Sequence, residues 1–220
     1  SVAEVLAKNK ASLDLFGLKK LTPDVAEALA KHKGELDLSG LRTLSLDTAQ
    51  ALANHQGVLS LWLTNPTPDV AEALAKNQGD LSIGGLLKLT NKHLAEKLIS
   101  QGFIFAGVQE ISPSVAEALA KHNGDLDLSS LITITPKVEE ALAKHKGKLI
   151  LPLLTKLTNK QFAEKLILQR FDFAEVKEIS ESVAETLVEN NAFDPINLLR
   201  LNSLTPRAPG ATPMPRGALI

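Results

Sequence analysis

The residues with the clearest capacity for chemistry are four histidines that recur at one position of a repeated pattern. Each follows an alanine-rich segment, and stacking of the repeats would place the four side chains in pairs. A metal site needs three or four converging ligands, however, and the residues beside these histidines are mostly lysines. We therefore predict polar, partly exposed side chains at helix C-termini, and we interpret the isolated His93 in the same way. The four are His32, His55, His122 and His145.

Carboxylates also recur, at positions between paired apolar residues that are predicted to form short strands. Asp37 and Asp127 lie in separate repeats and cannot form a catalytic pair. We interpret these side chains as a solvated strand face that discourages unwanted edge association, with cation binding or acid/base chemistry as the alternative. The positions between the pairs are Asp14, Asp37, Ser60, Ser82, Ile104, Asp127, Ile150, Asp172 and Asn197.

No other pattern indicates an enzyme. The chain has no cysteine, which excludes disulfides, thiolate zinc sites and cysteine nucleophiles. It has no phosphate-binding loop, nucleophile elbow or dinucleotide-binding glycine motif. We predict no catalytic residue, no cofactor and no metal.

The pattern that carries these residues is an internal repeat. Two apolar residues spaced two apart recur at intervals of 23, 23, 22, 22, 23, 23, 22 and 25 residues, and we call each stretch from one pair to the next a unit. The side chains of a pair point to one face of a short strand. The pairs are Leu13/Leu15, Leu36/Leu38, Leu59/Leu61, Leu81/Ile83, Phe103/Phe105, Leu126/Leu128, Leu149/Leu151, Phe171/Phe173 and Ile196/Leu198.

Most pairs are followed by two more apolar residues at spacings of three, which predict a corner, and then by a short helix. The Trp62 unit is one residue short, and Leu63 and Pro66 fill these slots there. A hydroxyl residue precedes each helix as the predicted N-cap, at Thr22, Ser45, Thr67, Thr90, Ser112, Thr135, Thr158 and Ser180. A glycine follows five of the helices as a predicted left-handed stop, at Gly34, Gly57, Gly79, Gly124 and Gly147.

Helices of this length are marginal alone, so the units must stack to bury their leucines. The predicted fold is an α/β solenoid of about nine strand–corner–helix coils, with a parallel sheet on one face and short helices on the other. It spans residues 1–205, and residues 206–220, with four prolines, form a predicted tail.

The stretch LDLSGLRTLSLDTAQALANHQGVLSL resembles the leucine-rich repeat family, in a bacterial-type variant with a repeat of about 23 residues. One feature departs from the family, because the slot that usually holds Asn or Cys after the strand is apolar here, as at Leu18, Leu41 and Leu86. The resemblance implies binding of proteins or other ligands on the concave, strand-lined face.

A longer period lies over the shorter one. LTNKHLAEKLISQGFIFAGVQEIS from Leu89 matches LTNKQFAEKLILQRFDFAEVKEIS from Leu157. The helices in these two stretches lack the glycine stop, and phenylalanines replace leucines in the following strands. The array is therefore predicted to have a coarser pattern of three units.

Composition narrows the range of partners. The net charge of −1 argues against a general nucleic-acid or anionic-membrane binder. The longest apolar run is about six residues, from Leu149 to Leu154, so we predict no membrane insertion. The compartment is left open. Because the chain begins at Ser1 in the middle of the pattern, we expect a processed product or a fragment.

The predicted function is a non-enzymatic scaffold that binds a protein partner on the strand face. Trp62 is either a binding hot spot or a packing residue in a shortened corner. The alternative function is self-assembly into oligomers or filaments, since the chain starts with an unpaired helix and ends with an unpaired strand. The candidate partner-binding residues are Phe16, Asp37, Trp62, Ile104, Asp127 and Ile150.

Overall fold

The structure is a computed structural model that describes residues 1–132, 134–192 and 203–205. In this part of the chain, nine helices alternate with short strands. The helices are α1 (Val2–Ala7), α2 (Pro23–Ala30), α3 (Leu46–Leu52), α4 (Pro68–Ala75), α5 (Lys92–Ser100), α6 (Pro113–Ala120), α7 (Pro136–Ala143), α8 (Lys160–Leu168) and α9 (Glu181–Glu189). The strands are β1 (Leu13–Asp14), β2 (Leu36–Asp37), β3 (Leu59–Trp62), β4 (Leu81–Gly84), β5 (Lys88–Leu89), β6 (Glu110–Ile111), β7 (Leu126–Asp127), β8 (Leu149–Ile150), β9 (Lys156–Leu157), β10 (Glu178–Ser180) and β11 (Ser203–Thr205). The predicted pair Ile196/Leu198 and the tail 206–220 lie outside the described residues.

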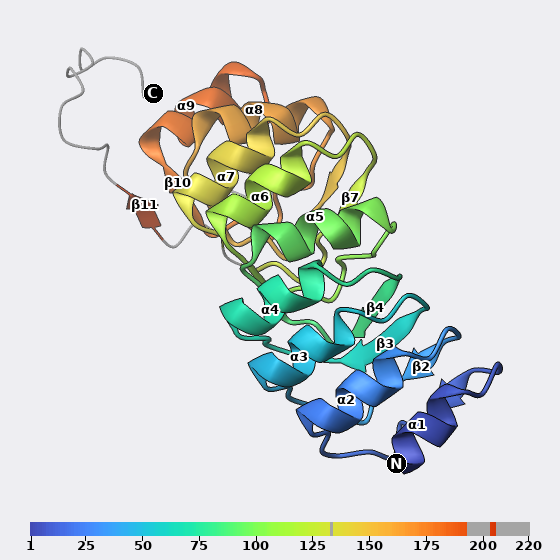
Figure 1. The fold of residues 1–220 in the computed structure, drawn as a ribbon. Coiled ribbons are helices and arrows are strands. Elements are labelled where there is room, and N and C mark those ends of the chain that lie inside the picture. Colours follow the sequence, from blue (N-terminus) through green and yellow to red (C-terminus); the bar gives the residue numbers. More distant parts are fainter. Residues whose placement is uncertain (133, 193–202, 206–220) are drawn as a thin grey trace.

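Equivalent elements of successive units lie next to one another. Each helix packs on the next in sequence order, from α1 to α9 (Figure 1). The strands pair in parallel, and Leu13 lies opposite Leu36, which in turn lies opposite Leu59. The predicted α/β architecture of short parallel strands and short helices is confirmed, and it is compatible with a repeat fold. No described helix is long and apolar enough to cross a bilayer.

The strands fall into separate groups. One sheet has the order β1-β2-β3-β4, and β7 pairs with β8. The strands predicted at Phe103/Phe105 and Phe171/Phe173 do not form, which corrects the sequence prediction. A glutamine side chain takes the place of the missing neighbour: the backbone N–H of Leu81 donates to Gln101 Oε1 (3.3 Å) and that of Leu149 to Gln169 Oε1 (3.1 Å).

A second set of strand pairs lies at the last apolar position of several corners, which the sequence assigned to the corner alone. β5 pairs with β6, and β10 lies between β9 and β11. Ion pairs cross both ladders: Lys88 Nζ lies 2.6 Å from Glu110 Oε1, and Lys156 Nζ lies 2.9 Å from Glu178 Oε2. A Lys and a Glu at equivalent positions of successive units were the available signal for this pairing, since opposite charges favour direct cross-strand neighbours.

Most of the predicted hydroxyl N-caps are confirmed, and two are corrected. Asn91 and Asn159, rather than the preceding threonines, cap α5 and α8. Their side-chain oxygens accept from Leu94 N (2.8 Å) and Phe162 N (2.9 Å). Thr22 stands at the N-cap of α2, but its side chain makes no capping bond. Side-chain caps are present at Ser45, Thr67, Ser112, Thr135 and Ser180.

The prediction that five glycines end helices in a left-handed conformation is wrong. Among the described glycines only Gly85 and Gly102 have positive φ, and Gly102 follows α5, a helix predicted to lack a glycine stop. There the N–H of Phe103 donates to Leu98 O and that of Gly102 to Ile99 O, which is a Schellman motif. Arg170 makes the same turn after α8 with φ 58°.

Three of the predicted stops, Gly57, Gly79 and Gly147, instead permit close approach of neighbouring units. A Cβ atom added to Gly57 would overlap the carbonyl oxygen of Gly34, and one added to Gly147 would overlap that of Gly124. Glycine is required at these positions because two backbones nearly touch there, and φ is not the reason.

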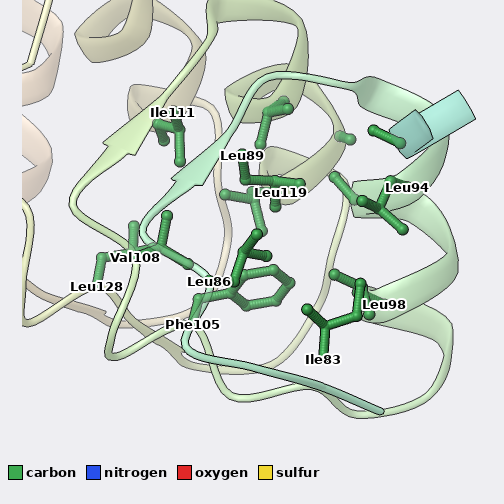
Figure 2. Packing of buried hydrophobic residues seen from close by; sticks show 14 of the residues in the cluster. Ile83, Leu86, Leu89, Leu94, Leu98, Phe105, Val108, Ile111, Leu119 and Leu128 are labelled. Atoms are coloured by element: carbon green, nitrogen blue, oxygen red, sulfur yellow. The ribbon is translucent and has the colours of Figure 1, made fainter. Parts of the chain in front are cut away.

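The core is one continuous cluster of mainly Leu, Ala, Val and Ile side chains between the helices and the strands. Where the unit begins with phenylalanines, the ring of Phe105 turns into this core beside Leu86 and Leu98 (Figure 2). Phe103 packs edge-on against Phe105 with ring centroids 5.0 Å apart, and Phe171 and Phe173 repeat the arrangement at 5.1 Å. The larger rings therefore fill the interior at the places where no strand forms.

Replacing Gly57 with alanine should destabilise the protein by about 2 kcal/mol, because the added methyl group meets backbone that cannot move independently. The midpoint of urea denaturation measures the change. Gly107→Ala is the matched control, since nothing lies within 4 Å of a Cβ added there. Equal midpoints for the two variants would contradict close approach as the reason for the glycine.

Candidate functional site

The candidate partner-binding residues lie on or beside the first set of strands. Asp14, Asp37, Ser60 and Ser82 form one row in register across the sheet β1–β4. Asp127 lies opposite Ile150 in the pair β7–β8. Of the six candidates, Asp37 and Trp62 therefore share the sheet β1–β4, and Asp127 and Ile150 share the pair β7–β8. Phe16 follows β1, and Ile104 lies in no strand.

The apolar candidates are exposed. Phe16, Trp62, Ile104 and Ile150 all have substantial solvent-accessible side chains, with Ile104 the most exposed of the four at 73%. These positions alternate with pair residues that are mostly buried, as expected for a strand with one solvent-facing side. The two candidate carboxylates, Asp37 and Asp127, are half-buried.

The aspartates also have a local structural role that the sequence analysis missed. Asp37 Oδ1 accepts from Ser39 N (2.8 Å), and Asp127 Oδ1 accepts from Ser129 N (3.0 Å) and from the Ser129 hydroxyl. Asp14 and Asp172 make the same bond to the N–H two residues on. Each aspartate thus uses one carboxylate oxygen to hold the turn that follows the apolar pair. In the sequence, the signal for this role was an aspartate two residues before the start of the corner.

Trp62 lies on a flat backbone platform. Its ring is so close to Gly84 that a Cβ there would lie 2.6 Å from a ring carbon, and it also covers Gly85, which has φ 69°. On the other side the Arg42 guanidinium lies 5.4 Å from the ring centroid. Trp62 therefore has a packing role, and it still leaves 44% of its surface in solvent.

A pocket connects two of the candidates. Its lining joins Ile104 to Asp127 across the boundary between two units, and its volume is about 190 Å³. The remaining lining residues are Ile99, Gly102, Phe103, Phe105, His122, Asp125 and Leu126.

Three of the four repeated histidines are more buried than the partly exposed side chains that the sequence predicted. His32, His55 and His145 are buried, and His122 is half-buried. His32 stacks on His55 with ring centroids 6.2 Å apart, and His122 stacks on His145 at 6.5 Å. Stacking of units buries a position that would be exposed on one helix alone.

These stacks do not form a metal centre. Each stack brings only two histidines together. Within the described residues there is no group of three or more His, Asp or Glu side chains placed to hold a metal. His93 is exposed, and its Nδ1 lies 2.8 Å from Glu72 Oε2. Hydrogen bonds from Asn91 and His93 lower the pKa of Glu72 to about 2.

Burial decides the charge state of the stacked histidines. Desolvation lowers the pKa of His55 and of His145, although backbone groups of Ala30 and Gly124 near the rings oppose the shift. Electrostatic interactions with Lys165 and His122 also lower the pKa of His145. Both ring nitrogens of His55 and His145 are buried without a hydrogen-bond partner.

Glu139 is a completely buried carboxylate that the sequence analysis passed over. It lies in α7, and its carboxylate accepts from Thr158 N (2.9 Å), the Thr158 hydroxyl (2.9 Å) and Asn159 N (2.6 Å). Burial raises its pKa, and these hydrogen bonds oppose the shift. In the sequence, the signal was a charged residue at a helix position that is alanine in other units, as at Ala26, Ala71 and Ala116.

Comparisons of the chain with protein-family models, with curated proteins and with solved structures gave no match.

Replacing both His55 and His145 with asparagine should reduce the loss of stability between pH 7 and pH 5. The folded-state pKa of each histidine lies below its usual 6.5, so the unfolded chain binds protons first and stability falls as the pH drops below about 6.5. Asparagine fits this slot, as Asn77 donates there to Leu52 O and His55 O. Urea midpoints across this pH range test the prediction. Parallel pH profiles for variant and wild type would rule out the histidines as the source.

Replacing Glu139 with alanine should cost about 2 kcal/mol of stability at pH 7, because backbone N–H groups of Thr158 and Asn159 lose their acceptor. Thermal or urea unfolding measures the loss. Glu140→Ala is the matched control: Glu140 is exposed and makes only a 3.5 Å ion pair with Lys144, so its loss should change stability by less than about 0.5 kcal/mol. A Glu139→Ala variant as stable as the control would contradict the assigned role.

Proposed function

We propose that this protein is an α/β solenoid of leucine-rich-repeat type that acts as a non-enzymatic scaffold and binds a protein partner on its strand-lined face. The repeat of 22 or 23 residues and the parallel ladders between equivalent positions support the architecture. The helix-lined side presents short amphipathic helices to solvent.

The observation that carries the binding proposal is the exposure of large apolar side chains along the strand side. Phe16, Trp62, Ile104 and Ile150 lie in four different units and face solvent, while the pair residues beside them turn into the core. Aromatic and large aliphatic side chains in such positions are typical anchors of protein interfaces. Trp62 is the best preorganised of them, because Arg42 and the Gly84–Gly85 backbone hold its ring in place.

Self-assembly is the second candidate function. Among the described strands, β1 pairs on one side only, with β2. Beside this edge, Val2 and Val5 of α1 are largely exposed. A second copy that covered these groups would bury apolar surface and extend the sheet.

The two functions are separated by one set of variants. The strand-face variant carries Trp62→Ser, Ile104→Ser and Ile150→Ser, and the control carries Val25→Ser, Leu168→Ser and Val188→Ser, which remove exposed apolar side chains from helices. Peptides selected from a displayed library on the wild-type protein should lose at least tenfold in affinity for the strand-face variant and keep it for the control. Equal binding to both variants would contradict the strand face as the binding surface.

Self-assembly predicts a different result in the same preparation. Sedimentation velocity should then show oligomers that dissociate in a Val2→Ser/Val5→Ser variant. A monomer at all concentrations would exclude this second function for the chain.

A further inference from the structure

The pocket between residues 102–105 and β7 has the size of one side chain. Its volume of about 190 Å³ is close to the roughly 150 Å³ of a protein cavity that holds a benzene ring. It is smaller than the roughly 300–1,000 Å³ of drug-sized ligand sites. The dimensions therefore favour a single large apolar side chain as its occupant.

The pocket lies at an interruption of the strand pairing. Residues 103–105 form no strand, so the ladder of the sheet β1–β4 does not continue into β7–β8. Gly102, which lines the pocket, has open space within 4 Å of the position a Cβ would take. Phe103, Ile104 and Leu126 contribute apolar surface to its lining.

The rim of this pocket is acidic. Asp125 Oδ1 accepts from Lys148 N (2.9 Å), and Asp127 Oδ1 is held by Ser129, so each carboxylate is fixed through one oxygen. Among the described residues neither aspartate forms an ion pair with a lysine or arginine of this chain. Two fixed carboxylates without a cationic partner complement a positive charge on a ligand.

We propose that this pocket receives a large apolar or aromatic side chain of an extended partner segment, and that Asp125 and Asp127 bind a Lys or Arg adjacent to it. The proposal rests on the scaffold function above and names the chemistry of its partner. Asp127 and Ile104 therefore act together, while Trp62 and Asp37 belong to the separate sheet β1–β4 and Phe16 follows its first strand.

The test uses a fluorescent hexapeptide with Phe–Arg at its centre and Gly/Ser flanks, and a second peptide with Phe–Glu. On the wild-type protein, backbone amide NMR shifts should change at residues 99–105 and 122–127 for Phe–Arg, with binding at least about fivefold weaker for Phe–Glu. Asp125→Asn/Asp127→Asn should weaken Phe–Arg binding about fivefold and reduce its salt dependence. Asparagine retains the Oδ1 acceptor for Lys148 N and for Ser129 N, so the fold is kept.

The apolar part is tested separately. Ile104→Ser should weaken both peptides, and Leu168→Ser, a similarly exposed aliphatic position on α8, should leave binding unchanged. Shifts elsewhere on the strand side, or equal affinity for Phe–Arg and Phe–Glu, would overturn the proposal. If peptides selected from the library depend on Trp62 and Ile150 but ignore Asp125, Asp127 and Ile104, this inference fails while the scaffold function stands. If no peptide depends on the strand face, the scaffold function itself fails.

Discussion

The backbones of successive units approach one another so closely that a methyl group does not fit between them. Gly34, Gly57 and Gly79 form one series of such contacts, and Gly124 and Gly147 form another. This spacing brings the leucine pairs into parallel register, and it lets the histidine rings stack over the same segments. Within each series, the pairing of the strands and the burial of the histidines depend on this close approach.

After the last glycine of each series, a lysine side chain from the following helix binds backbone carbonyl oxygens. Lys97 Nζ donates to the carbonyl oxygens of Asn77 and Gly79, at 2.8 and 3.0 Å. Lys165, at the equivalent position of α8, donates to those of His145 and Gly147, at 2.6 and 2.9 Å. At the same boundaries a glutamine side chain bonds the strand edge where no further strand forms. A phenylalanine ring fills the core there. Lysine and glutamine side chains of the next unit therefore bond backbone groups that face these boundaries.

The units differ from one another mainly at these boundaries. Between them the strand side is regular, and the polar residues mostly hold turns or cap helices. At the boundary around Phe103 the pairing stops, and a pocket lies beside two carboxylates without an ion-pair partner within the described chain. A repeated structure acquires a distinct binding surface most readily where the repeat is broken, because equivalent positions elsewhere already satisfy their neighbours.

The sequence by itself determined the units, because the spacing of the leucine pairs, the N-cap hydroxyls and the alanine-rich helices are local features whose physics acts within a single unit. It also identified the solvent-facing positions of Phe16, Trp62, Ile104 and Ile150, since alternation along a strand needs no knowledge of the neighbouring unit. Only the tertiary structure decided the burial of His55 and Glu139 and the absence of a strand at Phe103. It also decided that close backbone approach is what requires glycine at position 57. Each of these depends on groups of an adjacent unit, and the distance between two backbones is a property of packing that no local pattern contains.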